Sequence, residues 1–280
     1  MLQFMENGEY YLIDLGSRNG SFVNGRRVSI PVTLHNGDRL TFGQTELEFY
    51  CPSLKSSASA ESTSALESRE ATATATLHVR RLISVLVVDI RNFTGLTRQL
   101  DEKILSEMIG TWFRHAGDII REHGSWVDKY IGDAVMAVWI HGTQEISNEE
   151  MLKILNATSA LHKMTSDLYN HYPLPFPLRI GAGINTGYAM VGNTGSGDRP
   201  DYTALGDTVN AAFRLETSTK QIGKDISVGK TTYQYLTALG ADNSLFEEHM
   251  VTLHGYETPV VVYACTFMEL DAFLKSHNFS

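Results

Sequence analysis

The segment that most constrains the fold of this chain is residues 52–77, PSLKSSASAESTSALESREATATATL. Serine, threonine and alanine dominate the segment, and it contains no aromatic residue. Such a stretch cannot bury enough apolar surface to offset the entropy that ordering would cost. We therefore expect a linker, or at most a weak helix, between two separate parts of the chain. The expected division is a small domain over residues 1–51, a linker over 52–79 and a larger domain over 80–280.

Composition narrows the classes of function. Apolar residues make up 42% of the 280 residues, which is enough for a real core. The formal net charge of -9 makes a long nucleic acid a poor partner, whereas a small anionic substrate is compatible if metal ions mask its charge. No apolar run reaches the length of a membrane span, and the start MLQFMENGEYY is too polar for a signal peptide. We expect a soluble, cytoplasmic protein. Cys51 and Cys265 form no CxxC pair, so neither a zinc site nor a disulfide framework is predicted.

The N-terminal part alternates apolar and polar residues in short runs: YYLIDL, SFVNG, RRVSI, DRLTFG and TELEFY. Turn signals that include Asn-Gly dipeptides separate these runs, which predicts a small all-β sandwich. The string DLGSRNGSFVNG, followed by LHNGDRLTFG, resembles a forkhead-associated (FHA) domain. Ser17, Arg18 and Asn19 match part of that family's phosphopeptide loops, but the first strands and the phosphopeptide-contacting arginine should precede Met1. We expect a sandwich fragment that contacts a phosphoprotein only if the domain is completed.

The larger part mixes strands and helices. LISVLVVDI, residues 82–90, is a nearly continuous apolar run that predicts a strand in a covered sheet. Residues 101–122 predict an amphipathic helix capped by Asp101. SWVDKYI and AVMAVWI flank Gly132-Asp133 and predict a hairpin. The apolar face of the predicted helix consists of Ile104, Leu105, Met108, Trp112, Ala116 and Ile119.

The remaining pattern completes a recognisable order of elements. Residues 148–171 predict a second helix, and the prolines that follow it at 173, 175 and 177 mark a loop. LRIGAGINTG and AMVG predict two strands, GDTVNAAFRLETSTKQIG a third helix, and DISVG, MVTLHG and VVVYACT three closing strands. The order β-α-β-β-α-β with extra units predicts an α+β, ferredoxin-like domain.

Two aspartates at strand ends are the strongest candidates for chemistry. Asp89 ends the apolar strand, and Asp133 lies at the tip of the predicted hairpin. Two carboxylates of one sheet can chelate hard cations, and two such cations can clamp the oxygens of a phosphoryl transfer. The turn after Asp89, with Asn92, Phe93 and Thr94, leads towards a helix whose backbone N–H groups could hold phosphate oxygens. Either aspartate taken alone would usually be only a turn or cap residue.

Three longer strings, VVDIRNFTGL, DKYIGDAVMAVW and DYTALGDTVNAAFRLE, resemble the signature blocks of class III adenylyl and guanylyl cyclases, in the family's order. The resemblance covers residues 80–267. It implies a site with two divalent cations, Mg²⁺ or Mn²⁺, and it assigns a role to each matching position. The implied metal ligands are Asp89, Asp133 and the carbonyl of Ile90; the purine-selecting residues are Lys129 and Thr203; the ribose-orienting residue is Asn210; and the residue that stabilises charge at the α-phosphate is Arg214.

The chemistry of the purine positions favours adenine. Adenine offers an acceptor at N1 and a donor at its amino group, which Lys129 and the Thr203 hydroxyl can match. Guanine reverses this pattern, and a mismatched buried polar group costs about 1–3 kcal/mol. The implied function is an adenylate cyclase that converts ATP to cyclic AMP and pyrophosphate. Threonine at position 203 also resembles a subgroup that includes bicarbonate-stimulated cyclases. A bicarbonate response is a hypothesis that equal product formation in bicarbonate and chloride, at matched pH, would exclude.

Of the positions expected to contact phosphate, Arg214 matches the family and His254 departs from it. Asn210 and Arg214 are four residues apart in a predicted helix and so share a face, and arginine offers a planar fork of donors. The family often has lysine where this chain has His254. Histidine is mostly neutral at pH 7, so we expect weaker ATP binding than with lysine, and tighter binding at mildly acidic pH. The alternative for Lys129 and Arg214 is solvated surface charge, and for Asn210 a polar residue on a helix surface.

The resemblance to the cyclase family also implies a homodimer. Asp133 and Lys129 lie on one short hairpin, yet the metals and the purine belong to opposite ends of ATP. The family resolves this with a head-to-tail dimer and two shared active sites, in which one chain supplies Asp89 and Asp133 and the other supplies Lys129, Thr203, Asn210 and Arg214. The implied reaction is in-line attack of the ribose 3′-hydroxyl on the α-phosphorus. The alternatives are a guanylate cyclase, a non-catalytic nucleotide-binding regulator and a phosphopeptide-binding adaptor.

Overall fold

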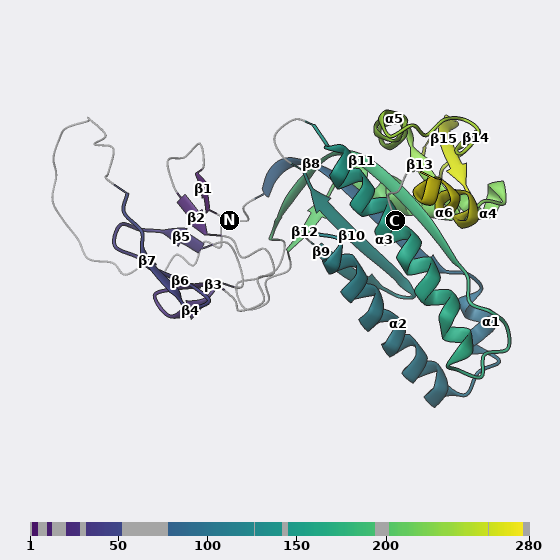
Figure 1. The fold of residues 1–280 in the computed structure, drawn as a ribbon, viewed down its shortest axis with the longest axis horizontal. Coiled ribbons are helices and arrows are strands. Elements are labelled where there is room, and N and C mark those ends of the chain that lie inside the picture. The colour runs from purple at the N-terminus through teal and green to yellow at the C-terminus, as the bar shows by residue number, and fades with distance from the viewer. Residues whose placement is uncertain are drawn as a thin grey trace. The chain divides into compact units, whose positions relative to one another are not determined.

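The structure is a computed structural model, and it describes residues 2–4, 10–12, 21–28, 32–51, 78–125, 127–141, 145–193, 202–256 and 258–276 (Figure 1). The chain divides into two compact units. One contains Met1–Leu77 and Gly192–Tyr202, and the other contains His78–Val191 and Thr203–Ser280. The predicted linker at 52–77 lies outside the described residues, as do Ser17, Arg18 and Asn19.

The N-terminal unit is a small all-β structure, as predicted. One antiparallel sheet has the order β1-β2-β5 and the other β4-β3-β6-β7. The Asn24-Gly25 turn joins β3 to β4 with φ values of 52° and 77°, a left-handed conformation that explains the Asn-Gly dipeptide. Strands β1 and β5 were not predicted, because runs of three residues carry little periodicity. The strands are β1 (Leu2–Phe4), β2 (Tyr10–Leu12), β3 (Ser21–Val23), β4 (Arg26–Arg27), β5 (Val32–Leu34), β6 (Arg39–Phe42) and β7 (Thr45–Glu48).

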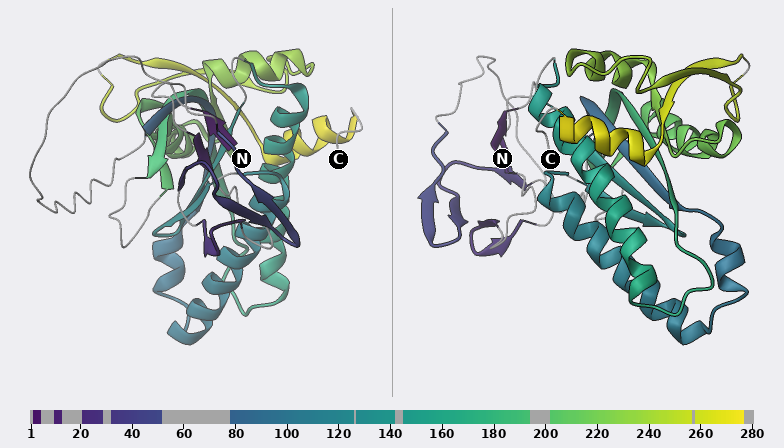
Figure 2. Two further views of the ribbon diagram at one scale, coloured as in Figure 1. Left: turned by 90° about the vertical axis from the view of Figure 1, so that its left-hand side faces the viewer. Right: turned by 45° about the vertical axis from the view of Figure 1, so that its right-hand side comes forward.

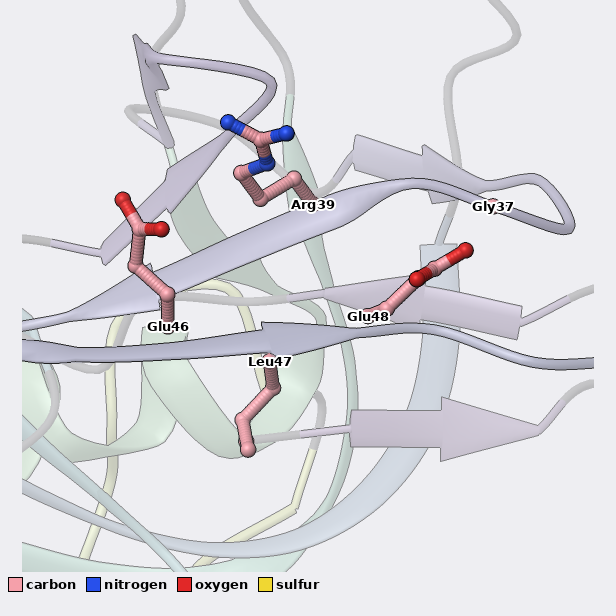
Figure 3. A pocket seen from close by; sticks show the side chains of 5 residues that line it. All are labelled: Gly37, Arg39, Glu46, Leu47 and Glu48. Carbon is pink, nitrogen blue, oxygen red and sulfur yellow. The ribbon is translucent and has the colours of Figure 1, made fainter.

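An open hollow of about 410 Å³ lies on the β6–β7 hairpin of this unit. Figure 3 shows the side chains of Arg39, Glu46 and Glu48 on one side of the hairpin, with Leu47 pointing to the other. The lining combines both signs of charge and includes none of the predicted nucleotide-binding residues. The hollow is therefore not the site that the sequence predicts.

The C-terminal unit is built on one eight-stranded sheet of order β14-β15-β13-β11-β8-β10-β9, with β12 beside β11. The run β8-α2-β9-β10-α3-β11 is the predicted β-α-β-β-α-β order, so the α+β, ferredoxin-like prediction is confirmed. The strands are β8 (His78–Ile90), β9 (Val127–Ile131), β10 (Ala134–Ile140), β11 (Ile180–Asn193), β12 (Tyr202–Leu205), β13 (Ile226–Gly229), β14 (Glu247–Val251) and β15 (Val260–Cys265). The helices are α1 (Phe93–Thr97), α2 (Glu102–Glu122), α3 (Asn148–Asp167), α4 (Asp207–Ile222), α5 (Lys230–Ala238) and α6 (Phe267–Ser276).

Helices α2 and α3 pack side by side against one face of the sheet (Figure 1). Asp101 caps α2 as predicted, because its side chain accepts hydrogen bonds from the N–H groups of Lys103 and Ile104 at 3.0 and 3.3 Å. The predicted apolar face is nearly right: Ile120, rather than Ile119, is the fully buried residue in the last turn. Helix α6 packs against α3 (Figure 2). None of the helices in the described ranges is both long and apolar enough to cross a membrane.

Both faces of the central strand β8 are buried, which explains its nearly continuous apolar sequence. Leu86 and Val88 face the core formed with α2 and α3, while Val85 and Val87 point to the opposite face.

Helix α4 approaches β11 closely at Gly183, where a Cβ atom would overlap the backbone of Ala212 and Glu216. Two predicted strands merge into the single strand β11, because LRIGAGINTG and AMVG have no turn between them. Strand β12 and helices α5 and α6 were not predicted, and all of them are short. The predicted second helix ends earlier than expected, at Asp167, and a single 3-10 turn continues it to Asn170.

Candidate active site

The structure brings Asp89 and Asp133 together at one end of the β8–β10 pair. Asp89 lies opposite Ala134 in the strand register, and Asp133 immediately precedes Ala134 in the β9–β10 turn. Gly132 enables this turn with a φ of 64°. Burial, the charge of Asp89 and a hydrogen bond with Asp89 all raise the pKa of Asp133. The two carboxyl groups therefore form a like-charge pair whose electrostatic repulsion a cation would relieve.

The donor set fits a magnesium-type site. Among the described residues, no group of three or more His, Cys, Asp or Glu side chains gathers around one position. Mg²⁺ is usually held by one or two carboxylates and takes its remaining ligands from water and substrate phosphates. Asp89 and Asp133 match this requirement. Ile90 follows Asp89 at the end of β8 with its side chain buried, and the ligand role of its carbonyl stays a prediction.

The predicted phosphate-binding turn follows directly. Asn92 is in the left-handed conformation, with a φ of 57°, and precedes the five-residue helix α1. Asn92 and Thr94 are exposed, while Phe93 packs partly against the core. The turn therefore has the predicted place and a helix after it, and its contact with phosphate stays a prediction.

Two charged residues that the sequence did not indicate join the carboxylate pair. The Lys220 ammonium donates to Asp89 Oδ2 at 3.0 Å and lies 4.0 Å from Glu216 Oε1. Glu216 is only 4% exposed, and burial raises its pKa to about 7. Their four-residue spacing on α4 was a usable signal that the two face each other. Nothing in the sequence showed that they face Asp89.

Arg91 anchors the chain just after the predicted ligands. Its guanidinium donates to the carbonyls of Ile180 and Lys224 at 3.3 and 2.7 Å, and to Thr219 Oγ1 at 3.0 Å. These three bonds tie the end of β8 to β11 and to the C-terminal end of α4. The three hydrogen bonds of Arg91 therefore hold the chain in place two residues after Asp89, without involving the carboxylate pair itself.

Lys129 lies on the same face of the sheet as Asp89. In the register, Lys129 is opposite Met136 and Met136 is opposite Val87, two residues before Asp89. Directly opposed residues, and residues two apart on one strand, share a face. Two strand spacings and two residues of rise separate the Cα atoms of Lys129 and Asp89 by about 12 Å. Thr203 is buried on β12, which pairs with β11, so the two predicted purine residues come from different strands.

Asn210 and Arg214 lie on α4, away from the carboxylate pair. Two residues of helix correspond to a rotation of about 200°, so Arg214 points to the side of α4 opposite Glu216. Because Glu216 is the residue that packs on β11 and lies near Lys220, Arg214 faces away from Asp89 of its own chain. Asn210 is exposed and, four residues before Arg214, lies on the same side.

Arg214 has neighbours that the sequence did not reveal. Its guanidinium carbon lies 4.8 Å from the centroid of the Tyr256 ring. The Tyr256 hydroxyl donates to both oxygens of Asp207, at 2.8 and 2.9 Å. Gly255 has a φ of 80°, and a Cβ atom there would lie 3.2 Å from the arginine. His254 is exposed and precedes Gly255 in the same turn. It is therefore next in the sequence to a residue that contacts Arg214.

Comparisons with known proteins give a consistent result. The family model "Adenylate and Guanylate cyclase catalytic domain" matches residues 78–265, and the model "FHA domain" matches residues 1–43. A curated adenylate cyclase of Anabaena cylindrica is 27% identical over 183 residues, which cover 65% of this chain and 36% of that protein. The chain thus spans about a third of the length of this relative.

Solved structures extend the comparison to the fold. The adenylyl cyclase CyaB from P. aeruginosa is similar with a TM-score of 0.57 and 26% identity, covering 67% of this chain and 95% of that chain. The guanylyl cyclase Cya2 is similar with a TM-score of 0.55 and 26% identity, covering 67% of this chain and 92% of that chain. Similarity of this kind therefore does not distinguish the two purines.

Proposed function

The chain belongs to the adenylate and guanylate cyclase catalytic domain family through residues 78–265, and from this premise we propose that it converts ATP to 3′,5′-cyclic AMP and pyrophosphate. The observation that carries the proposal is the contact between Asp89 and Asp133, two carboxyl groups at a strand end with the pKa of Asp133 raised. The test is product formation by the purified chain with ATP and GTP in parallel, in Mg²⁺ and in Mn²⁺. Cyclic AMP from ATP alone is expected. Cyclic GMP would favour the guanylate cyclase alternative, and no product would favour a non-catalytic regulator.

Each site residue has one part in the proposed reaction. Asp89 and Asp133, with the carbonyl of Ile90, would hold two divalent cations, which when bound would acidify the ribose 3′-hydroxyl and neutralise the departing pyrophosphate. Arg214 donates to the oxygens of the α-phosphate, where negative charge builds up in the transition state. Asn210 orients the ribose, and the turn of Asn92, Phe93 and Thr94 holds phosphate oxygens.

The side of α4 that carries Arg214 supports a dimer with shared sites. Arg214 and Asn210 face away from the carboxylate pair of their own chain, so a second chain must bring the two halves together. Exposed apolar side chains lie on β9 and β12, the strands that carry the purine residues, and on β11, which pairs with β12, as a covered surface would require. They are Tyr130 and Ile131 on β9, Tyr188 and Met190 on β11, and Leu205 on β12. We therefore propose a two-fold symmetric homodimer with two sites.

The domain limits remain part of the proposal: residues 80–280 for the cyclase domain, 52–79 for the linker and 1–51 for the FHA-like fragment. The FHA family match over residues 1–43 is compatible with this division. Because the residues that would read a phosphate lie outside the described ranges, a phosphoprotein partner is proposed only for a completed domain.

Purine selection gives a prediction for Lys129. Lys129→Glu places an acceptor opposite adenine N1, so the ratio of kcat/KM for ATP to that for GTP should fall by about 10- to 100-fold. The measurement is the initial rate of each cyclic nucleotide over a range of triphosphate concentration. Lys129→Met is the matched control: it should lose ATP turnover without gaining any for GTP. An unchanged ratio in Lys129→Glu would show that position 129 does not read the purine.

The turn at His254 gives a second prediction. His254→Lys puts a permanent charge on the exposed turn beside Arg214, and we expect KM for ATP to fall by about 3- to 10-fold at pH 7. His171→Lys is the control, because His171 is exposed and pairs with Asp167 at 3.0 Å. An unchanged KM in His254→Lys would mean that histidine is no handicap at this position.

A further inference from the structure

Lys220 forms an ion pair with a carboxylate oxygen of Asp89 that a bound metal ion would need. Its ammonium lies 3.0 Å from Asp89 Oδ2, although the two residues are 131 positions apart in the sequence. The Lys220 side chain is 47% exposed and that of Asp89 is 19% exposed, so the contact lies at the edge of the site. With Asp133 against the same carboxylate, Lys220 is the counter-charge of the pair in this structure.

A second acceptor for Lys220 lies one helical turn earlier. Glu216 Oε1 is 4.0 Å from the Lys220 ammonium, and the Glu216 side chain is 5% exposed. This oxygen has no hydrogen-bond partner. A Cβ atom on Gly181 would lie 2.5 Å from it, so the carboxylate rests against the backbone of β11. The nearby Arg91 guanidinium donates to Ile180, Thr219 and Lys224, and not to Glu216.

We propose that Lys220 is a built-in counter-ion of the metal site, which pairs with Asp89 when no cation is bound and moves to Glu216 Oε1 when a cation binds Asp89. A cation on Asp89 repels an ammonium on the same carboxylate, so the two compete for one oxygen. The flexible lysine stem needs to shift its ammonium by only about 1 Å to reach hydrogen-bond distance from Glu216. The arrangement keeps the buried Glu216 from being left unpaired in the metal-bound state.

This inference rests on the metal role proposed for Asp89, and its test reads metal binding directly. Lys220→Met keeps most of the stem and removes the charge. We expect Mn²⁺, followed by electron paramagnetic resonance without nucleotide, to bind Lys220→Met about 3- to 10-fold more tightly than wild type. Lys163→Met is the matched control, because Lys163 is similarly exposed, at 57%, and pairs with Asp271 at 3.3 Å, away from Asp89. Its Mn²⁺ affinity should equal that of wild type.

Thermal unfolding supplies an independent readout. In EDTA, Lys220→Met should have a lower Tm than wild type, because Asp89 and Asp133 lose their counter-charge. In saturating Mn²⁺ this deficit should shrink, because the cation supplies the counter-charge of the two aspartates and only the contact of Lys220 with Glu216 is then missing. A residue with a merely structural role would lower the Tm equally in both conditions.

Glu216→Gln tests the second half of the proposal. Glu216→Gln should weaken Mn²⁺ binding more in a protein that has Lys220 than in the Lys220→Met background. Only a protein with Lys220 has an ammonium that the cation must displace towards residue 216. Equal or weaker Mn²⁺ binding by Lys220→Met would overturn the competition, and equal effects of Glu216→Gln in both backgrounds would overturn the transfer. Asp89→Ala separates these failures from that of the proposed function: if it binds Mn²⁺ like wild type, the metal site itself is wrongly placed.

Discussion

Asp89→Ala is expected to lower cyclic nucleotide formation on the order of 10³-fold or more, because it removes a carboxylate on which both cations depend. Asp89 lies opposite Ala134 near the end of a buried strand and touches the Asp133 carboxyl, so the substitution leaves Asp133 as the only carboxylate of the pair. The measurement is the initial rate with ATP in Mg²⁺ and in Mn²⁺, together with Mn²⁺ binding. Loss of binding and of rate together would tie the defect to the metal site rather than to the nucleotide.

The matched control for this variant is Asp118→Ala. Asp118 also pairs with a cationic side chain, that of Arg121 at 2.6 Å, but it lies exposed on α2. We expect its activity to stay within a factor of two of wild type, since exposed ion pairs contribute little. The folded state of Asp89→Ala is checked by its thermal unfolding in EDTA. A rate above a tenth of wild type in a folded Asp89→Ala would contradict the proposed role of the carboxylate pair.

Mixing two inactive variants is expected to restore about a quarter of the wild-type activity if sites are shared across a two-fold dimer. Arg214→Ala alone should lose on the order of 10²-fold in kcat, because a donor to the transition-state charge is gone. Mixed with Asp89→Ala, it forms heterodimers in half of the pairings. Each heterodimer has one intact site, which combines Asp89 of one chain with Arg214 of the other.

The control for this recovery mixes Asp89→Ala with Asp133→Ala. Both lesions then fall in the same half of the site, so every site lacks a carboxylate and no activity should return. Exchange of subunits is verified with two differently tagged chains. Exchange without recovery in the first mixture would show that Asp89 and Arg214 act within one chain, contrary to the direction in which α4 presents Arg214.

Patterns within single elements predicted much of this fold. The apolar run of β8, the Asp101 cap and the hydrophobic spacing of α2 each depend on a few neighbouring residues, and the structure confirms them. The same holds for the Gly132-Asp133 turn, whose glycine has the left-handed φ that such turns require. The errors also have local causes. The predicted apolar face of α2 named Ile119 where Ile120 is buried, an error of one residue in the helical periodicity. Strand β12 was missed because its four residues are too few to show an alternating pattern.

What the amino-acid sequence determined by itself is most of the order of the elements, several of the turns between them, and the places of Asp89 at a strand end and Asp133 in a hairpin turn. These depend on local backbone preferences and on the chemistry of side chains within a few residues. Only the tertiary structure decided which charge meets those carboxylates, since Lys220 reaches Asp89 across 131 positions. It likewise decided that the Tyr256 hydroxyl donates to Asp207 across 49 positions. Such contacts depend on the register of the sheet and on which side of α4 packs against β11. The residue pattern of one segment does not indicate which side chains of a distant segment will contact it in the folded protein.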